Sequence, residues 1–349
     1  MTSGRHKTGP NASWRLGAAP PSTMAGPRNP LITGLDRLFA GQEDPLALGA
    51  LRVAIAGILF LSALLHVGNV GEYFSDESMI HGRFARLAFP SRWSLFFTVT
   101  DPTAVRAIWA LGVVALGMWT LGLFTRISAI VGMVLWVSMY GRNYLLYAYP
   151  DQLALMYGVL LATMPAGRGL SLDARWRGKG GTVPVWCRRL FQLQLAIVYT
   201  STGLAKTGDT WWVDYTAIYY TLTNPYNRHF DAGPLFAALQ PWLLKPMTFV
   251  VLWWELLFGG FTVWHWVRDM LGKRLPIRGW KIPDLRWLFL GFGAAMHVGI
   301  QLGVYVVFFS PLIVGSYLCF FDSDELRRAH AWIGDRLGRL RRRLLPSRA

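Results

Sequence analysis

Long apolar runs follow one another along most of the sequence, and they limit what this chain can fold into. Each run is bounded by charged residues, Pro or Gly, and most approach the ~20 residues that an α-helix needs to cross the core of a bilayer. The runs are Leu46–Val67, Thr103–Phe124, Ile127–Tyr149, Leu153–Pro165, Leu190–Leu204, Pro246–Val267 and Trp287–Phe321. This pattern predicts an all-α fold, a polytopic bundle of membrane-spanning helices.

The last run, Trp287–Phe321, is 35 residues long. That is too long for one span, but it allows two short or tilted spans with a turn near Tyr305–Pro311. Two spans keep the basic C-terminal tail on the same side as the other basic loops, whereas one span would place the tail outside, against the positive-inside rule. The sequence therefore predicts eight spans with both termini cytoplasmic, in a multi-pass protein of the cell membrane.

Charge is scarce and unevenly placed. Only 15% of the residues are charged, against about 25% in an average soluble domain. The formal net charge is +16, and on the eight-span topology all of this excess lies on the cytoplasmic side. The basic loops are short and adjoin the ends of the spans, so the charge marks topology and we expect no nucleic-acid partner.

Composition divides the chain into three regions. Residues 1–44 are rich in Pro, Gly, Ser and Arg and predict a mobile cytoplasmic arm, and residues 45–321 form the transmembrane domain. Residues 322–349 space Leu and Ile among arginines, which is typical of a basic amphipathic helix on anionic membrane lipid, the alternative being a simple solvated end. Two outer segments, 68–101 and 207–241, carry many aromatic residues and are expected at the membrane interface.

Familiar catalytic motifs are missing. The sequence holds no P-loop, GxSxG, CxxC or HExxH pattern. Its two cysteines, Cys187 and Cys319, are too few for a disulfide framework or a metal cluster, so we expect free structural thiols and no metal site.

A few polar residues inside apolar runs are the candidates for chemistry, because a charge at a span centre costs roughly 2.5–3.5 kcal/mol. Lys206 ends the fifth run, just after the small residues Ser201 to Gly203, and Glu255 lies in the middle of the sixth. His297 lies in the seventh run, with Gln301 four residues later on the same helical face. These four side chains could line one site in the outer half of the bundle. A lysine that snorkels to the headgroups and a histidine that only bridges helices are the plainer alternatives.

The segment around Lys206 resembles the signature helix of the HTTM family, the membrane region shared with vitamin K-dependent gamma-carboxylase. The resemblance is carried by the pattern Gln192-x-Gln194-x-x-x-x-Tyr199-x-x-x-Gly203-x-x-Lys206-x-x-x-x-Trp211, followed by Tyr219. Glu255 and the segments around His297 and Phe308 to Phe321 are similar in order and spacing, so that the resemblance covers roughly residues 45–321. Lipase maturation factors and SdpB-like proteins resemble the same segment more distantly.

The resemblance implies a reduced quinone, vitamin K hydroquinone or menaquinol, that reacts with oxygen in carboxylation and epoxidation chemistry. It places Lys206 as the base that deprotonates the quinol and His297 as a hydrogen-bonding partner at the reacting centre. The residues expected to contact the cofactor are Tyr199, Trp211, Trp212, Tyr219, Glu255 and Gln301. A dry, aromatic-lined site agrees with this role, because lost hydration favours the neutral amine of Lys206 that can accept a proton.

Two departures from the carboxylase are visible. Asp151 and Gln152 stand at the start of the fourth run, where the resemblance predicts a histidine, and the chain ends 28 residues after the last run, without the large outer domain that recognises protein substrates. We therefore expect the part that recognises a secreted peptide or protein substrate to be either missing or supplied by a partner. Quinol-linked chemistry on a smaller or membrane-borne substrate is the alternative to carboxylation of glutamate. A non-enzymatic maturation factor for such a substrate is the second hypothesis. A transporter is weaker, because no internal repeat is evident.

Overall fold

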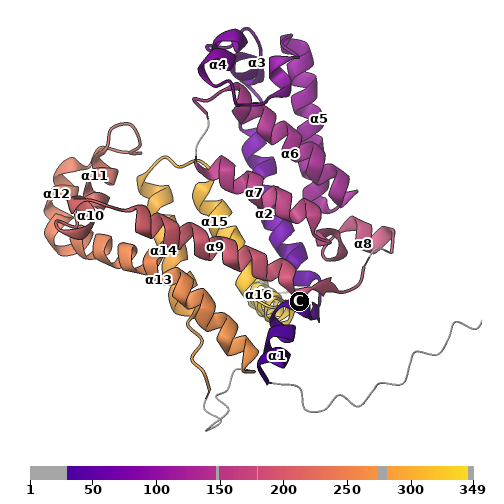
Figure 1. Ribbon diagram of the computed structural model, residues 1–349, viewed down its shortest axis with the longest axis vertical. Helices are drawn as coiled ribbons and strands as arrows, with labels where there is room; N and C mark the ends of the chain where they lie inside the picture. The colour runs from indigo at the N-terminus through magenta and orange to yellow at the C-terminus, as the bar shows by residue number, and fades with distance from the viewer. Residues whose placement is uncertain (1–29, 147–148, 179, 273–280, 345–349) are drawn as a thin grey trace, which may run out of the picture.

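The computed structural model describes residues 30–146, 149–178, 180–272 and 281–344, and these are mostly helical (Figure 1). The long helices are α2 (Leu46–Leu64), α5 (Pro102–Leu121), α6 (Thr125–Arg142), α7 (Tyr149–Thr163), α9 (Val185–Ala205), α13 (Lys245–Met270), α14 (Arg286–Gly303) and α16 (Ser323–Leu344). A shorter helix, α15 (Phe309–Ser316), continues into the 3-10 turn η5 (Tyr317–Phe320). In Figure 1, α2, α5, α6 and α7 form one group of helices, and α9, α13, α14 and α15 form a second.

Short elements connect and cover these helices. Before α2 lie α1 (Pro30–Leu35), the π-helical turn η1 (Asp36–Ala40) and strand β1 (Gln42–Glu43), which pairs antiparallel with β2 (Val183–Pro184). The first outer segment holds α3 (Val70–Phe74), α4 (Gly82–Ala88) and η2 (Leu95–Phe97). The second outer segment holds α10 (Asp209–Trp212), α11 (Ala217–Thr223), α12 (Gly233–Leu239) and η4 (Gln240–Leu244). Between α7 and β2 lie η3 (Ala166–Arg168) and α8 (Leu172–Trp176).

The α5–α6 hairpin shows how the sequence sets a tight reversal. Asp101 caps the first turn of α5 by accepting a hydrogen bond from Ala104 N at 2.8 Å. At the other end Gly122 takes a left-handed φ of 70°, which ends the helix, and α6 begins three residues later. The Asp173 carboxylate accepts from the backbone N of Thr125 at 2.8 Å and so caps the start of α6.

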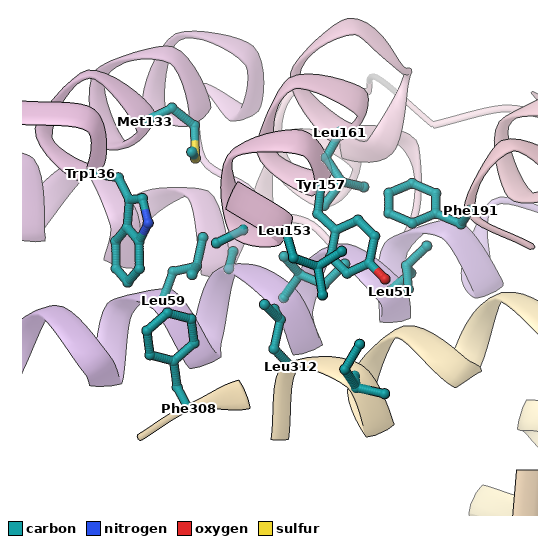
Figure 2. Packing of buried hydrophobic residues seen from close by; sticks show 14 of the residues in the cluster. Leu51, Leu59, Met133, Trp136, Leu153, Tyr157, Leu161, Phe191, Phe308 and Leu312 are labelled. Atoms are coloured by element: carbon teal, nitrogen blue, oxygen red, sulfur yellow. The ribbon is translucent and has the colours of Figure 1, made fainter. Parts of the chain in front are cut away.

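The core is centred on α2. Leu51 and Leu59 of α2 are fully buried, and Leu153 and Tyr157 of α7 pack in the same cluster. Figure 2 shows these side chains with Trp136 of α6 on one side and with Phe308 and Leu312, from just before α15 and within it, on the other. This packing joins the two groups of helices through α2.

Arg52 is a charged residue in the middle of α2, and it is 0% exposed. Its guanidinium donates to Thr120 O at 2.9 Å and to Leu170 O at 2.6 Å. The first of these acceptors lies at the C-terminal end of α5, where the free carbonyls of a helix carry partial negative charge. The buried arginine therefore joins helix ends and is not a candidate for chemistry.

A cluster of ion pairs holds the opposite end of the bundle from Lys206, and we call it the arginine cluster (Arg188, Arg189 and Arg286). Arg188 Nη2 lies 2.7 Å from Glu43 Oε2 of β1, and Arg189 Nη2 lies 2.8 Å from Asp269 Oδ2 of α13. Arg286 Nη2, at the start of α14, lies 2.6 Å from Glu325 Oε1 of α16. The cluster thus fixes β1, α13 and α16 against the helices they meet.

Three stretches of the described residues are long and apolar enough to cross a membrane: α2, α5 and the continuous stretch Gly233–Met270 that ends in α13. The other predicted runs also form helices, which fall short of the same limits in length or hydropathy. The 35-residue run does form two helices, α14 and α15, and the chain reverses at residues 304–308. Pro311, expected at this turn, lies inside α15.

Of the predicted arm, residues 1–29 lie outside the described residues, and residues 30–43 form α1, η1 and β1. In the C-terminal region α16 spans Ser323–Leu344, and residues 345–349 lie outside the described residues.

Candidate functional site

Lys206 and Glu255 form an ion pair between neighbouring helices. Lys206 caps the C-terminus of α9, and its Nζ donates to Oε2 of Glu255 in α13. The two side chains are only 19% and 11% exposed. The Lys206 ammonium also lies 4.9 Å from the ring centroid of Trp211, a distance at which cation–π attraction operates. The lysine therefore turns toward a carboxylate within the bundle, and it does not snorkel freely to the surface.

Small residues let α9 and α13 approach closely enough for this pair. A Cβ on Gly203 would lie 3.0 Å from the backbone N of Leu256. One turn along the contact, Gly259 N donates to Thr200 Oγ1 at 3.1 Å. Gly203 precedes Lys206 by less than one helical turn, so the helix contact fixes the place where the lysine emerges.

Gly203→Ala is expected to separate the two helices, because the new methyl group would lie 3.0 Å from the backbone N of Leu256 in α13 and 3.1 Å from atoms of the Leu256 side chain. We expect a loss of about 1–3 kcal/mol, the usual range for overpacking, together with weaker pairing of Lys206 and Glu255. Thermal unfolding in detergent measures the loss. Gly260→Ala is the control, because no heavy atom lies within 4 Å of a Cβ at Gly260. Equal melting temperatures for the two variants would contradict the close approach.

A second polar chain reaches the site from the other helices. Tyr199 of α9 places its hydroxyl 2.8 Å from His297 Nε2 of α14 and 2.5 Å from the Tyr317 hydroxyl of η5. His297 is 1% exposed, and its second ring nitrogen, Nδ1, has no hydrogen-bond partner within the described part of the chain. A buried polar nitrogen without a partner is costly, so this atom is a candidate ligand contact.

One cavity joins the two sets of residues. It has a volume of about 250 Å³. Its lining consists of Val198, Tyr199, Thr202, Lys206, Glu255, Met296, His297, Ile300, Phe309 and Ile313. We call it the inner cavity. It combines an ion pair, Lys206 and Glu255, with an imidazole and with apolar and aromatic walls.

The structure brings together four of the residues singled out in the sequence: Lys206, Glu255, His297 and Tyr199 line the inner cavity. Trp211 reaches only the ammonium of Lys206, and Trp212 donates its indole N–H to Lys206 O at 2.5 Å, so both support the lysine from outside. Tyr219 and Gln301 are not among the lining residues.

Sequence reasoning missed Tyr317 and Phe309. Tyr317 extends the hydrogen-bonded chain from His297, and Phe309 packs its ring edge-on to His297 with centroids 5.3 Å apart. A hydroxyl inside the apolar run 309–320 was the available signal for Tyr317. Phe309 carried no signal, because it is one of many aromatic residues in that run.

The apolar helices and this buried lysine–carboxylate pair define the class, a helical membrane protein with an internal polar site. The chain belongs to the HTTM family: the family model described as the HTTM domain matches residues 41–272, more than half of the chain. No curated protein and no solved structure matched the chain in the corresponding comparisons. The family match includes Lys206 and Glu255, whereas His297, Phe309 and Tyr317 follow it in the sequence.

Proposed function

We propose that the protein is an integral membrane enzyme that takes a proton from a reduced quinone, vitamin K hydroquinone or menaquinol, at Lys206, in chemistry of the carboxylation and epoxidation type. The observation that carries the proposal is the Lys206–Glu255 pair on the wall of the inner cavity, which is also lined by His297, whose Nδ1 has no hydrogen-bond partner among the described residues. Membership of the HTTM family supports it.

We further propose eight membrane crossings with both termini cytoplasmic. The helices that form in every predicted run support this topology, as does the position of the arginine cluster at the end that the positive-inside rule assigns to the cytoplasm. In α16, Trp332, Ile333 and Leu337 are 49–61% exposed among arginines, which suits contact with anionic lipid of the inner leaflet.

The residues of the inner cavity fit the head of a quinol. Apolar side chains and the rings of Tyr199 and Phe309 offer flat surfaces, and the volume of about 250 Å³ suits a ring system but not a long isoprenoid tail. The orphaned Nδ1 of His297 offers a hydrogen bond to a ring oxygen. A bound quinol would supply the acidic hydroxyl and the reducing electrons for the reaction with oxygen.

The chain's own groups can hold and move the proton. Glu255 pairs with Lys206, so a proton can pass between amine and carboxylate without changing the net charge of the site. Thr202 also interacts with the Glu255 carboxylate and orients it. If the Tyr199 hydroxyl donates to Nε2, the His297 proton lies on Nδ1, which has no partner among the described residues and is free to donate to a ligand.

Lys206→Arg tests the base, because a guanidinium keeps the ion pair with Glu255 but cannot give up its proton. We expect oxygen-dependent oxidation of menaquinol by the purified protein to fall at least about 100-fold, in the usual range for loss of a general base. Lys245→Arg, an exposed lysine at the start of α13, is the control and should retain the wild-type rate. Unchanged turnover in folded Lys206→Arg would refute the proposal.

A second candidate function, a non-enzymatic maturation factor, is favoured by exposed aromatic side chains on the second outer segment, 207–241, and directly after it. Tyr226 and Trp242 are 93% and 85% exposed, and Phe230 is 52% exposed. Such a surface fits contact with a secreted protein or peptide. Under this function, maturation of that partner would survive Lys206→Arg and would be lost in Tyr226→Ala with Trp242→Ala.

A further inference from the structure

A second and larger cavity lies beside the inner cavity, toward the same end of the bundle as Lys206. We call it the outer cavity, and its volume is about 680 Å³. Its walls come from the C-terminal ends of α2 and α6, the start of α7, and residues near 69–73, 227 and 305–309. The lining residues are Ser62, Leu65, His66, Asn69, Tyr73, Tyr140, Leu145, Leu146, Pro150, Asp151, Asn227, Tyr305, Val306, Val307, Phe308 and Phe309.

Phe309 is shared by the two cavities. It lines both of them, and its ring packs against His297 of the inner cavity. It is also the first residue of α15, directly after the irregular residues 304–308. Phe309 is therefore part of the wall between the outer cavity and the Lys206 site.

The segment before Phe309 is held in place from two sides. Tyr305 N donates to Asn227 O at 2.6 Å, and Gln301 Nε2 of α14 donates to Val307 O at 3.2 Å. Val307 has a φ of 47°, in the left-handed region that β-branched residues rarely adopt. Such strain persists only where neighbouring contacts impose it. The contacts of this segment therefore hold its backbone in one defined conformation.

The chemistry of the lining restricts the ligand. Half of the lining residues are polar, and they supply carboxylate, amide, hydroxyl and imidazole groups. Asp151 is 4% exposed and interacts with Tyr140. Arg92 donates to Tyr140 O at 3.3 Å and lines, together with these two residues, a smaller separate cavity. None of the described residues that line the outer cavity is a lysine or an arginine. A carboxylate ligand would lose its hydration there without gaining a cationic partner, which is strongly unfavourable.

From these observations we propose that the outer cavity binds the second substrate of the Lys206 site. The bound group of this substrate donates hydrogen bonds and carries no negative charge. It reaches the inner cavity past Phe309. The proposal rests on the proposed function for its link to catalysis. Under this proposal, the protein differs from an enzyme in which a glutamate substrate brings its free carboxylate to the quinol.

Cysteine labelling tests the passage without any assay of turnover. Ile300→Cys places a thiol on the wall of the inner cavity, and the native Cys187 and Cys319 are both fully buried, which keeps the background low. The probe is a trimethylammonium methanethiosulfonate reagent in water. We expect labelling of Ile300→Cys to rise at least about tenfold when Phe309→Ala is added, with Phe309→Leu as a milder variant that also keeps the core filled. Phe308→Ala is the matched control, because Phe308 lines only the outer cavity and packs on Trp136.

The class of ligand is tested at Ser62→Cys, a buried position of the outer cavity. Two probes are compared there: the cationic trimethylammonium reagent, and a methanethiosulfonate reagent that carries a negatively charged sulfonate group. The cationic reagent should label it at least about tenfold faster than the sulfonate reagent, after each rate is divided by that at Met79→Cys, which is 87% exposed at the surface. Equal normalised rates, or equal effects of Phe309→Ala and Phe308→Ala, would overturn the inference. Correct labelling combined with an active Lys206→Arg would instead reject the proposed function and leave the passage standing.

Discussion

Glu255→Leu alone is expected to destabilise the protein by about 3 kcal/mol, whereas Lys206→Met with Glu255→Leu should recover most of this loss. Removing one member of a buried ion pair leaves the other charge uncompensated, and replacing both members with apolar residues of similar size is often neutral. The partial exposure of Lys206, 19%, places the expected loss at the low end of the range for buried pairs. The measurement is a double-mutant cycle of unfolding free energies in detergent, with the quinol oxidation rate followed in the same samples.

This cycle separates stability from chemistry. The double variant should be folded and should lack quinol oxidation, because it restores packing without restoring a base. Arg228 and Asp231 provide the control pair, since the Asp231 side chain is 64% exposed and such pairs contribute at most about 1 kcal/mol. A coupling energy near zero for Lys206 and Glu255 would show that the two residues act independently.

The sequence predicted the helical elements well, because runs of apolar residues near span length have few other solutions. It also singled out Lys206, Glu255 and His297, because a polar group inside an apolar run requires a reason. That these three side chains lie close together in the folded protein could not be predicted in the same way. It depends on the close crossing of α9 and α13 at Gly203 and Gly259, and nothing in one sequence states which helices pack together.

Gln301 illustrates a limit of helical periodicity. It does follow His297 by four residues, but α14 ends at Gly303, so Gln301 lies in the last turn of the helix, and it is not among the residues that line the inner cavity. Its amide group instead donates to Val307 O and holds the reversal before α15. The predicted contact of Gln301 with the cofactor is therefore not supported by its position, and the residue acts on the segment that carries Phe309.

Arg286→Met is expected to cost about 3–5 kcal/mol and to release α16 from the bundle. Arg286 is 5% exposed, and its guanidinium donates two hydrogen bonds to Glu325 and further ones to Asp284 and to Phe320 O. The variant leaves carboxylates facing one another without the arginine, although Arg268 still lies 3.2 Å from Asp284. Unfolding in detergent gives the free energy, and limited trypsin cleavage after the arginines of α16 reports release of the helix.

The contact between Arg286 and Asp284 makes the stability of the protein depend on pH, and the sign of this dependence follows from the pKa of Asp284. Burial alone raises the pKa of Asp284, but the hydrogen bonds and charge of Arg286, with the charge of Arg268, outweigh it and lower the pKa to about 2. A carboxyl whose pKa is lowered on folding stabilises the protein above its unfolded pKa of about 4, and this contribution is lost as the pH falls from about 4 through 2. Asp284→Asn should therefore flatten the loss of stability in that window and leave the curve above pH 5 parallel to that of the wild type. Arg327→Met is the control for Arg286→Met, because Arg327 is half exposed and its pairs with Asp44 and Asp324 lie at the surface. If Arg286→Met behaved like Arg327→Met, the buried contact would contribute no more than a surface ion pair, and α16 would have to be held by its apolar contacts alone.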